Sequence, residues 1–312
     1  MKLYIGGPTE RQESKDLLLK IRDAIPQGFE VLNQDLEVDL YKAEQADAIF
    51  WRMDQADDSS WAVAGVAKAG KRPIIPIWNA SYAPKNLYGF QKDVQETNKK
   101  FIRKNSDREW PSKDIDGLIE DLKILEQNPD WRGIRKQKPG KENVNLNLPL
   151  YIIGDSRCLE NAWAFYETKK RFEECGILCH IPPEVLDGSY DIRDYPKRID
   201  MTKGTVDDCA DYASTKSSFL IGRADQKNLL GSRFEEGVGW FESKPILYKY
   251  QYLFPPRREF DKYLDRKDPS MHFSSVYRQN EELWKIRVHE DLTEEELAGV
   301  IIRARYMNNG KN

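Results

Sequence analysis

The segment Leu3-Tyr4-Ile5-Gly6-Gly7 is typical of a short buried strand that runs into a glycine turn, and Leu150-Tyr151-Ile152-Ile153-Gly154 repeats it. The two segments begin the two halves of the chain. A segment that is repeated near the middle of the chain indicates an internal duplication. If the chain is duplicated, the elements after each segment should follow the same order.

The elements after each segment follow the same order. The first half alternates apolar helical stripes with short apolar runs, at 17–25, 29–32, 39–47, 48–51, 61–69, 73–78 and 115–122. The second half does the same at 159–176, 177–181, 208–216, 219–222, 234–242, 245–248 and 293–304. Strands that alternate with helices predict an α/β protein of two doubly wound, parallel-sheet lobes of the Rossmann or flavodoxin-like type. We place the lobes at residues 1–148 and 149–312.

Composition narrows the class of protein. The 312 residues are long for a single core, and 49 Lys+Arg against 52 Asp+Glu give a net charge of -3. Stable binding of duplex nucleic acid needs a basic excess, so we do not expect it.

No apolar run approaches the roughly 18 residues of a membrane span, and the N-terminus lacks a secretory signal, so we expect a cytoplasmic protein without a membrane partner. The basic stretch 131–141 is interpreted as a solvated linker, with local phosphate binding as the alternative.

Metal and cofactor motifs are not found in the sequence. The four cysteines, Cys158, Cys175, Cys179 and Cys209, show no Cys-x-x-Cys spacing, and Cys179 and His180 should point to opposite faces of one strand. The sequence contains neither a Gly-x-x-x-x-Gly-Lys-Ser/Thr loop nor a Gly-x-Gly-x-x-Gly fingerprint. We therefore expect no metal and no cofactor.

One segment combines acidic residues with glycines at the start of a predicted helix: Gly231-Ser232-Arg233-Phe234-Glu235-Glu236-Gly237-Val238-Gly239. Ser232 and Glu235 fit a helix capping box. Gly237 and Gly239 would lie inside the helix, where each costs about 1 kcal/mol relative to alanine. Close approach of a ligand or of a neighbouring strand is the usual reason for such glycines. Ligands of doubly wound sheets bind at the carboxyl ends of the strands, where this segment should lie.

The pattern resembles the nucleoside 2-deoxyribosyltransferase family, which carries Gly-x-x-x-Glu-x-Gly-x-Ala followed by Gly-Lys-Pro. Gly231, Glu235, Gly237 and the pair Lys244-Pro245 carry the resemblance, which covers nearly all of the chain as two copies. It implies that Glu235 is the nucleophile that attacks C1′ of the sugar. Such a carboxylate stabilises an oxocarbenium-like state and forms a glycosyl ester. Counted from Gly70, the family spacing puts Ala62 at this position in the first half, so the N-terminal copy is interpreted as degenerate.

The resemblance also suggests the residues around the sugar and the base. Asp211 and Asp208 compete for the role of the acid that protonates the leaving base, because the helix can be aligned in two ways; an exposed helical carboxylate is the alternative. Tyr151 and Gly154 should wall the pocket, and Asp155 follows the same strand and could contact sugar hydroxyls or phosphate.

Two residues are candidates for binding the 5′ end of the substrate. Leu229 stands where the family has an aspartate or a serine, so Ser232 and Arg233 become candidates for binding a 5′-phosphate. A helix cap and a solvated charge are their alternative roles. Asn86 and Tyr88 lie about where a reaching loop of the family would be, with a plain surface loop as the alternative.

These observations predict cleavage or transfer of an N-glycosidic bond in a nucleoside or nucleoside 5′-monophosphate. Two alternatives stay open: a non-catalytic sensor of a nucleotide-derived ligand, and a nucleotide-processing enzyme of a modified-DNA pathway. The expected partner is a small molecule, and the resemblance leaves a homo-oligomer open.

Overall fold

The computed structural model describes residues 1–7, 12–52, 58–77, 114–153, 159–182, 206–223, 230–249, 271–287 and 292–309. The chain divides into two compact units, Met1–Lys138 and Pro139–Asn312. This division lies ten residues before the boundary expected from the repeat, so residues 139–148 belong to the second unit.

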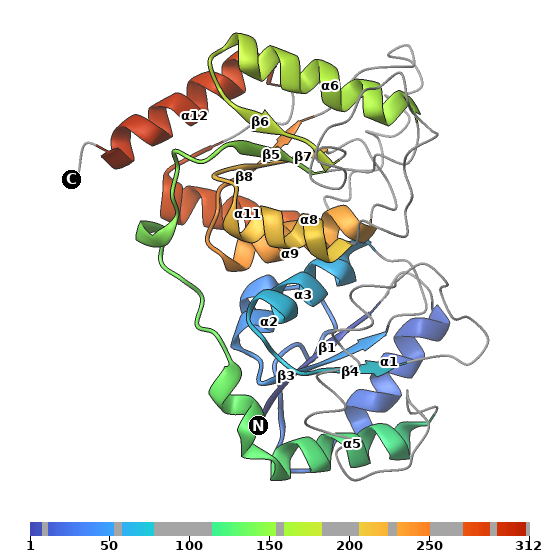
Figure 1. Cartoon of the computed structure of the whole chain (residues 1–312). Helices are drawn as coiled ribbons and strands as arrows, with labels where there is room; N and C mark the ends of the chain where they lie inside the picture. The colour runs from blue at the N-terminus through green and yellow to red at the C-terminus, as the bar shows by residue number, and fades with distance from the viewer. Residues whose placement is uncertain are drawn as a thin grey trace. The chain divides into compact units, whose positions relative to one another are not determined.

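The first unit is built on a parallel sheet with strand order β2-β1-β3-β4. Its strands are β1 (Lys2–Gly6), β2 (Glu30–Val31), β3 (Ala48–Arg52) and β4 (Ile74–Ile77). Its helices are α1 (Gln12–Ala24), α2 (Leu40–Gln45), α3 (Asp58–Ala69), α5 (Ile115–Gln127) and the 3-10 helix η1 (Pro129–Ile134). Helices α1 and α5 cover one face of the sheet, and α2 and α3 cover the other (Figure 1).

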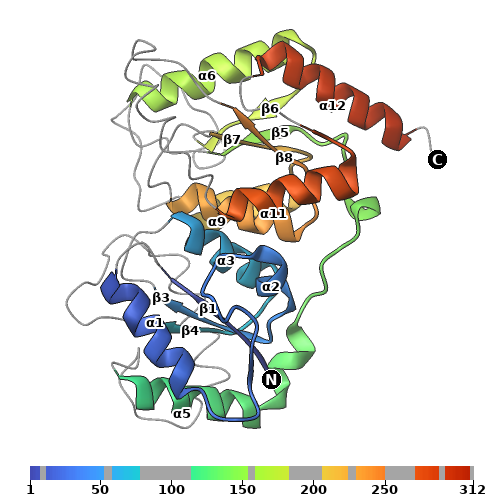
Figure 2. The same cartoon turned by 180° about the vertical axis from the view of Figure 1, so that it is seen from behind.

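The second unit repeats this plan with strand order β6-β5-β7-β8. Its strands are β5 (Leu150–Ile152), β6 (Cys179–His180), β7 (Leu220–Arg223) and β8 (Ile246–Lys249). Its helices are η2 (Lys141–Asn143), α6 (Leu159–Glu174), α8 (Val206–Thr215), α9 (Leu230–Phe241), α11 (Met271–Gln279), the π-helix η4 (Asn280–Trp284) and α12 (Glu294–Asn309). Helices α6 and α12 lie on one face, and α8, α9 and α11 lie on the other, as the view from behind also shows (Figure 2). Two α/β lobes with parallel sheets are thus confirmed.

Successive side chains along β5 and β6 point to opposite faces of the second sheet, so each strand contacts helices on both sides. Leu150 and Ile152 of β5 belong to the core that includes Phe165 and Phe172 of α6, whereas the ring of Tyr151 contacts α8. On β6, Cys179 joins the same core as Leu150, and the neighbouring His180 lies against the ring of Tyr212 in α8. The expectation that Cys179 and His180 face opposite sides is therefore confirmed.

The duplication extends to the turns that link a helix to the last strand of each sheet. Lys71 and Ser243 both adopt positive φ, at 51° and 57°. The next amide closes the helix in each unit: Arg72 N donates to Ala67 O at 2.8 Å, and Lys244 N donates to Gly239 O at 3.0 Å. This is the hydrogen-bond pattern of a Schellman motif. Lys71 is thus the counterpart of Ser243, and Arg72 is the counterpart of Lys244.

The side chains of Arg72 and Lys244 make equivalent hydrogen bonds in their two units. The Nε atom of Arg72 donates to the carbonyl of Ala46, directly after α2, at 3.0 Å. Lys244 Nζ donates to the carbonyl of Ser217, shortly after α8, and to its Oγ at 3.2 Å. Both side chains are buried, and the positive charge that each carries when protonated interacts favourably with the carboxyl end of α2 or of α8. The pair Lys244-Pro245, read as part of a family motif, therefore has a clear structural role.

Two predictions at helix starts had different outcomes. The capping box that begins α12 is present, because Glu296 N donates to Thr293 Oγ1 at 3.2 Å and Thr293 N donates to Glu296 Oε2 at 2.8 Å. The box expected at Ser232 is wrong. Helix α9 begins at Leu230, so Ser232 is an interior helical residue and cannot be the N-cap.

The interpretation of residues 131–141 as a solvated linker holds in part: the division between the two units falls at Lys138–Pro139, and Arg132, Gly133, Lys136 and Gln137 are exposed, but the beginning of the stretch is packed. Trp131 is fully buried, and its Nε1 donates to Leu125 O at 2.8 Å. Arg135 is ion-paired with Asp47, and the ammonium of Lys138 lies 5.5 Å from the centroid of the Tyr41 ring. Burial lowers the pKa of Lys138 to about 7. A single tryptophan brings enough apolar area to dock a segment that its charges alone would leave in water.

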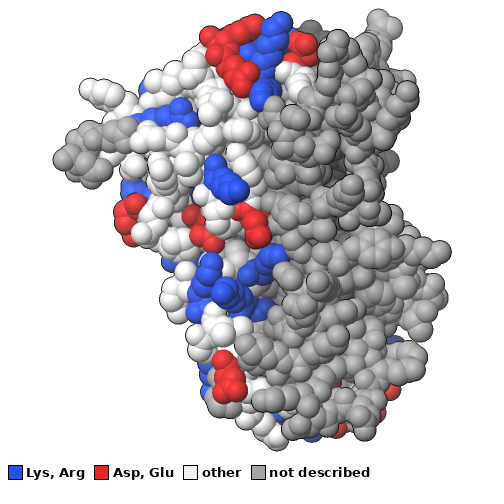
Figure 3. Space-filling view, viewed as in Figure 1, with Lys and Arg blue, Asp and Glu red and all other residues white. Residues whose placement is uncertain are grey.

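The described residues can be compared with what the composition predicts for apolar segments and for charge. No helix in the described part of the chain is long and apolar enough to cross a membrane. On the face drawn in Figure 3, basic and acidic side chains are interspersed over the described residues.

Candidate functional site

The strand order of the second unit defines where a ligand would bind. Strands β5 and β7 are neighbours in the centre of the sheet, and the chain leaves β5 for α6 on one face and β7 for α9 on the other. In doubly wound sheets, a crevice opens at such a point, outside the carboxyl ends of the two strands. Helix α9 begins shortly after the carboxyl end of β7, so its first turns lie beside this position.

Helix α9 carries two adjacent buried glutamates. The side chain of Glu236 has a defined set of partners: Arg233 Nη1 donates to its Oε1 at 2.8 Å and to its Oε2 at 2.9 Å, and Tyr248 Oη donates to Oε2 at 3.3 Å. Glu235, the predicted nucleophile, is only 5% exposed. Burial of an ionised carboxylate is costly, so neither glutamate is an ordinary solvated residue of a surface helix.

The environment of Tyr248 fixes the hydroxyl in its protonated state. Tyr248 is completely buried on β8, and burial, followed by the charge of Glu236, raises its pKa well above the ordinary value. Gly222 on the neighbouring strand β7 leaves space for the Tyr248 ring. A Cβ at Gly222 would lie 2.8 Å from Tyr248 Cε1 and 3.2 Å from Glu236 Oε1. Gly222, Tyr248, Arg233 and Glu236 therefore form one buried polar group between α9 and the sheet, which we call the α9 network.

The structure changes the interpretation of Arg233. This residue is 5% exposed and pairs with Glu236, so the interpretation as a solvated charge is wrong. A role in binding phosphate stays a prediction, but the guanidinium is already engaged by a carboxylate. Ser232 is also buried, within the first turn of α9.

The glycines of α9 have at least one structural cause. A Cβ at Gly239 would lie 2.1 Å from Leu220 Cδ1 and 3.7 Å from Ile246 Cδ1, so α9 can approach β7 and β8 only because this residue lacks a side chain. Of the two reasons expected for the glycines, a neighbouring strand is the one that applies at Gly239. Gly231 and Gly237 lie in the same helix, and their contact with a ligand stays a prediction.

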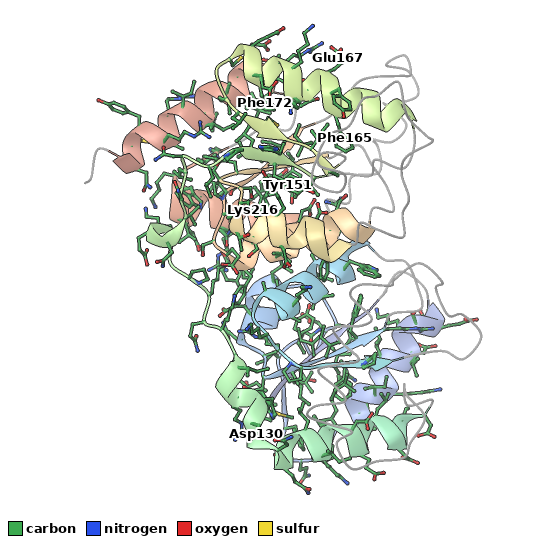
Figure 4. All side chains as sticks on the ribbon, viewed as in Figure 1. Asp130, Tyr151, Phe165, Glu167, Phe172 and Lys216 are labelled. Atoms are coloured by element: carbon green, nitrogen blue, oxygen red, sulfur yellow. The ribbon has the colours of Figure 1, made fainter. Side chains whose placement is uncertain are left out.

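Tyr151 belongs to an aromatic group on the same face of the sheet as α9. Its ring centroid lies 5.3 Å from that of Tyr212 on α8, and the His180 ring lies 5.5 Å from Tyr212 on the same side. The ammonium of Lys216 is 5.9 Å from the Tyr212 centroid. Figure 4 shows Tyr151 and Lys216 on the side of the sheet away from Phe165 and Phe172 of α6. Sequence reasoning did not include Tyr212 or His180 in the site, although strand alternation already placed His180 on this face.

The remaining predicted site residues lie on α8 or outside the described part of the chain. The side chain of Asp211 is exposed on α8, which matches the alternative of a plain helical carboxylate, and its carbonyl accepts a bond from Thr215 Oγ1 at 2.8 Å. Asp208 lies in the same helix, but its side chain is outside the described part of the structure. Four further candidates lie outside the described residues: Gly154, Asp155, Asn86 and Tyr88. Their roles stay predictions.

The first unit shows what stands in place of Glu235. The equivalent turns match Gly70 with Glu242, since Gly70 N donates to Val66 O at 2.9 Å and Glu242 N donates to Val238 O at 3.0 Å. Counted back from this match, Val63 is the counterpart of Glu235. The assignment to Ala62 is therefore wrong by one residue, because it aligned Gly70 with the residue after Glu242.

The α9 network is also replaced as a whole in the first unit. The same count places Trp61 at Arg233 and Ala64 at Glu236, and the strand registers place Trp51 at Gly222 and Pro76 at Tyr248. Trp51 and Trp61 pack edge to face with ring centroids 4.7 Å apart, and both are buried. An apolar aromatic pair thus occupies the position that a charged network holds in the second unit.

Among the residues that the structure describes, no three His, Cys, Asp or Glu side chains gather in a way that could hold a metal ion.

Comparison with known proteins does not assign a family. The sequence matches no protein-family model and no curated protein. Among solved structures, the glycotransferase of kitacinnamycin aligns with 97% of this chain and 98% of its own, at 12% identity and a TM-score of 0.21. A TM-score this low transfers neither fold nor activity, so the function has to be inferred from the site itself.

Proposed function

We propose that the second unit is an enzyme that cleaves or transfers the N-glycosidic bond of a nucleoside or nucleoside 5′-monophosphate, with Glu235 as the nucleophile. The observation that carries the proposal is the burial of Glu235 in the helix that follows β7, beside the switch point of the sheet. The neighbouring Glu236 has Arg233 and Tyr248 as partners, so the two acids have different environments in spite of their adjacency.

The chemistry follows from this placement. The bond between the base and C1′ breaks through a state with positive charge on the sugar, and a carboxylate held away from bulk water stabilises that charge strongly. Attack of a Glu235 oxygen on C1′ forms a glycosyl ester while the base leaves with the bonding electron pair and takes up a proton. Water then gives hydrolysis, and a second base gives transfer. Asp211 and Asp208 remain the candidates for the group that protonates the leaving base.

The proposal is tested with a panel of nucleosides and nucleoside 5′-monophosphates, with release of the free base followed by chromatography. We expect release by the wild type and a loss of at least about 100-fold in Glu235→Gln, which keeps the shape of the side chain but cannot attack C1′. Glu242→Gln is the matched control, because Glu242 directly follows the same helix and is only partly buried.

Two results would contradict the proposal. Equal rates of base release by the wild type and Glu235→Gln would show that Glu235 is not the nucleophile. Thermal stabilisation by a nucleotide without any turnover would favour the alternative of a ligand sensor.

A further inference from the structure

The C-terminal half of α12 carries three of the four large apolar side chains that are exposed in the described part of the chain. Ile302, Tyr306 and Met307 are 50%, 81% and 55% exposed, and the fourth is Leu178, directly before β6. A single exposed apolar residue is normal on a protein surface, but three within residues 302–307 of one helix form a patch. Figures 1 and 2 show this end of α12 extending beyond α6.

The other side of α12 is explained by packing within the second unit. The buried residues of the helix belong to the same core as Phe165 and Phe172 of α6; they are Leu297, Ala298, Ile301 and Ala304. In the first turn, Glu294 pairs with Arg171 of α6 at 3.4 Å. The helix therefore attaches to its own unit along one side and presents the apolar patch on the other.

Gly299 lies on the outward side of this helix, and no neighbour in the described part of the chain explains why it lacks a side chain. A Cβ at this position would have nothing within 4 Å, whereas a Cβ at Gly239 of α9 would lie 2.1 Å from Leu220 Cδ1. Glycine inside a helix is unfavourable relative to alanine. Close approach of another backbone from outside the chain would give this glycine the same purpose that β7 gives to Gly239.

The charges around Gly299 are arranged so that the helix can pair with its own copy. Glu295 lies four residues before Gly299 and Arg303 four residues after it, and both are exposed. Residues four apart lie on the same side of a helix. When two such helices cross antiparallel at their glycines, a two-fold axis sets Glu295 of each copy opposite Arg303 of the other. Within one chain the two residues are separated by two turns, about 12 Å along the axis.

We propose that the outward side of α12 binds a second copy of this chain through an antiparallel crossing of two α12 helices at Gly299. The glycines let the backbones approach, Ile302 packs beside the crossing, and Tyr306 reaches the first turn of the other helix. The two Glu295–Arg303 contacts fix the antiparallel direction. Helix α9 lies on the other face of the sheet, so the inference does not depend on the proposed function.

Sedimentation velocity on the full chain tests this dimer. One helix crossing is a small interface, so the dimer should be weak and the sedimentation coefficient should rise with protein concentration. Gly299→Leu should weaken the dimer by at least about 10-fold, because the new side chains hold the two backbones apart. In the monomer the same change meets no neighbour and improves helix propensity, so the melting temperature should not fall. Leu178→Ser removes an exposed apolar residue outside α12 and is the matched control.

Charge reversal tests the direction of the pairing. Arg303→Glu should weaken the dimer by at least about 10-fold, since it sets like charges at two symmetric contacts. Glu295→Arg should have the same effect. The double variant Glu295→Arg/Arg303→Glu should return the dissociation constant to within about threefold of the wild type, because the exchanged charges match again across the two-fold axis. A general loss of structure cannot give such a rescue, and thermal unfolding checks each fold.

Each outcome supports or overturns the inference. A chain that is monomeric at all concentrations overturns it, and so does a dimer that Gly299→Leu leaves unchanged, since that dimer forms through another surface. A monomer that floats with phosphatidylcholine vesicles assigns the patch to a lipid surface instead. A dimer that weakens in Gly299→Leu and in Arg303→Glu supports the inference, even in a protein that releases no base from nucleosides. These two variants also decide the question should Glu295→Arg fail to fold.

Discussion

Replacement of Gly239 by alanine tests whether the close approach of α9 to the sheet explains this helical glycine. Alanine should stabilise an α-helix by about 1 kcal/mol relative to glycine. The new Cβ, however, would lie 2.1 Å from Leu220 Cδ1 and 3.3 Å from its Cγ. Leu220 is fully buried in β7, and protein interiors are close-packed, so its side chain can make room only by displacing its neighbours in the core. Overpacking of this kind costs about 1–3 kcal/mol, which outweighs the gain in helix propensity.

We therefore expect Gly239→Ala to lower the stability of the second unit by about 1–2 kcal/mol, measured by urea unfolding. The melting temperature should fall by roughly 2–4 °C for each kcal/mol. The first unit suggests the control, because Ala67 and Ile49 stand at the positions of Gly239 and Leu220. Leu220→Ile should therefore rescue Gly239→Ala in part. A Gly239→Ala variant that is as stable as the wild type would refute the packing argument.

Two further predictions concern stability. Burial lowers the pKa of Lys244 from 10.5 to about 7, so unfolding takes up a proton between these pH values and the free energy of unfolding should rise with pH from about 7 to about 10. One proton over this pH range corresponds to a rise of at most about 4 kcal/mol. Lys244→Met should remove this contribution and leave that of Lys138, whose pKa burial also lowers to about 7. An unchanged slope in urea titrations at several pH values would contradict this. Thr293→Ala removes the hydrogen-bond partner of the Glu296 amide at the start of α12 and should destabilise the protein by about 1 kcal/mol in thermal unfolding, whereas an effect below about 0.3 kcal/mol would mean that the capping box contributes little.

Much of the architecture could be predicted from the sequence because hydrophobic periodicity is a local property. The short strands at Leu3 and Leu150, the helices between them and the repeated order all follow from it. The capping box at Thr293 is local in the same way. The failures have non-local causes. Ser232 matched the same local pattern, but the chain before it is already helical. Trp131 packs the beginning of a basic linker through contacts that its neighbours in sequence do not indicate.

The candidate site was predictable only in part for a related reason. A motif could single out Glu235, but not the different environment of its neighbour Glu236, which depends on Tyr248 from another strand and on the space left by Gly222. Likewise, the contact of Tyr212 with Tyr151 joins a helix to a strand far away in the sequence. Side-chain partners of this kind depend on the three-dimensional packing, which cannot be deduced from the hydrophobic periodicity of the sequence.

The matched turns at Lys71 and Ser243 have a practical consequence for engineering. Residues 58–77 and 230–249 each contain one helix, one such turn and one edge strand, and the two stretches have the same length. A graft of one stretch in place of the other therefore keeps every loop length, but residues 230–249 in the first unit would set Tyr248 and Glu236 against Trp51, which stands where the second unit has Gly222. Such a graft thus needs Trp51→Gly as well, so that the ring of Tyr248 has the space that Gly222 leaves in the second unit.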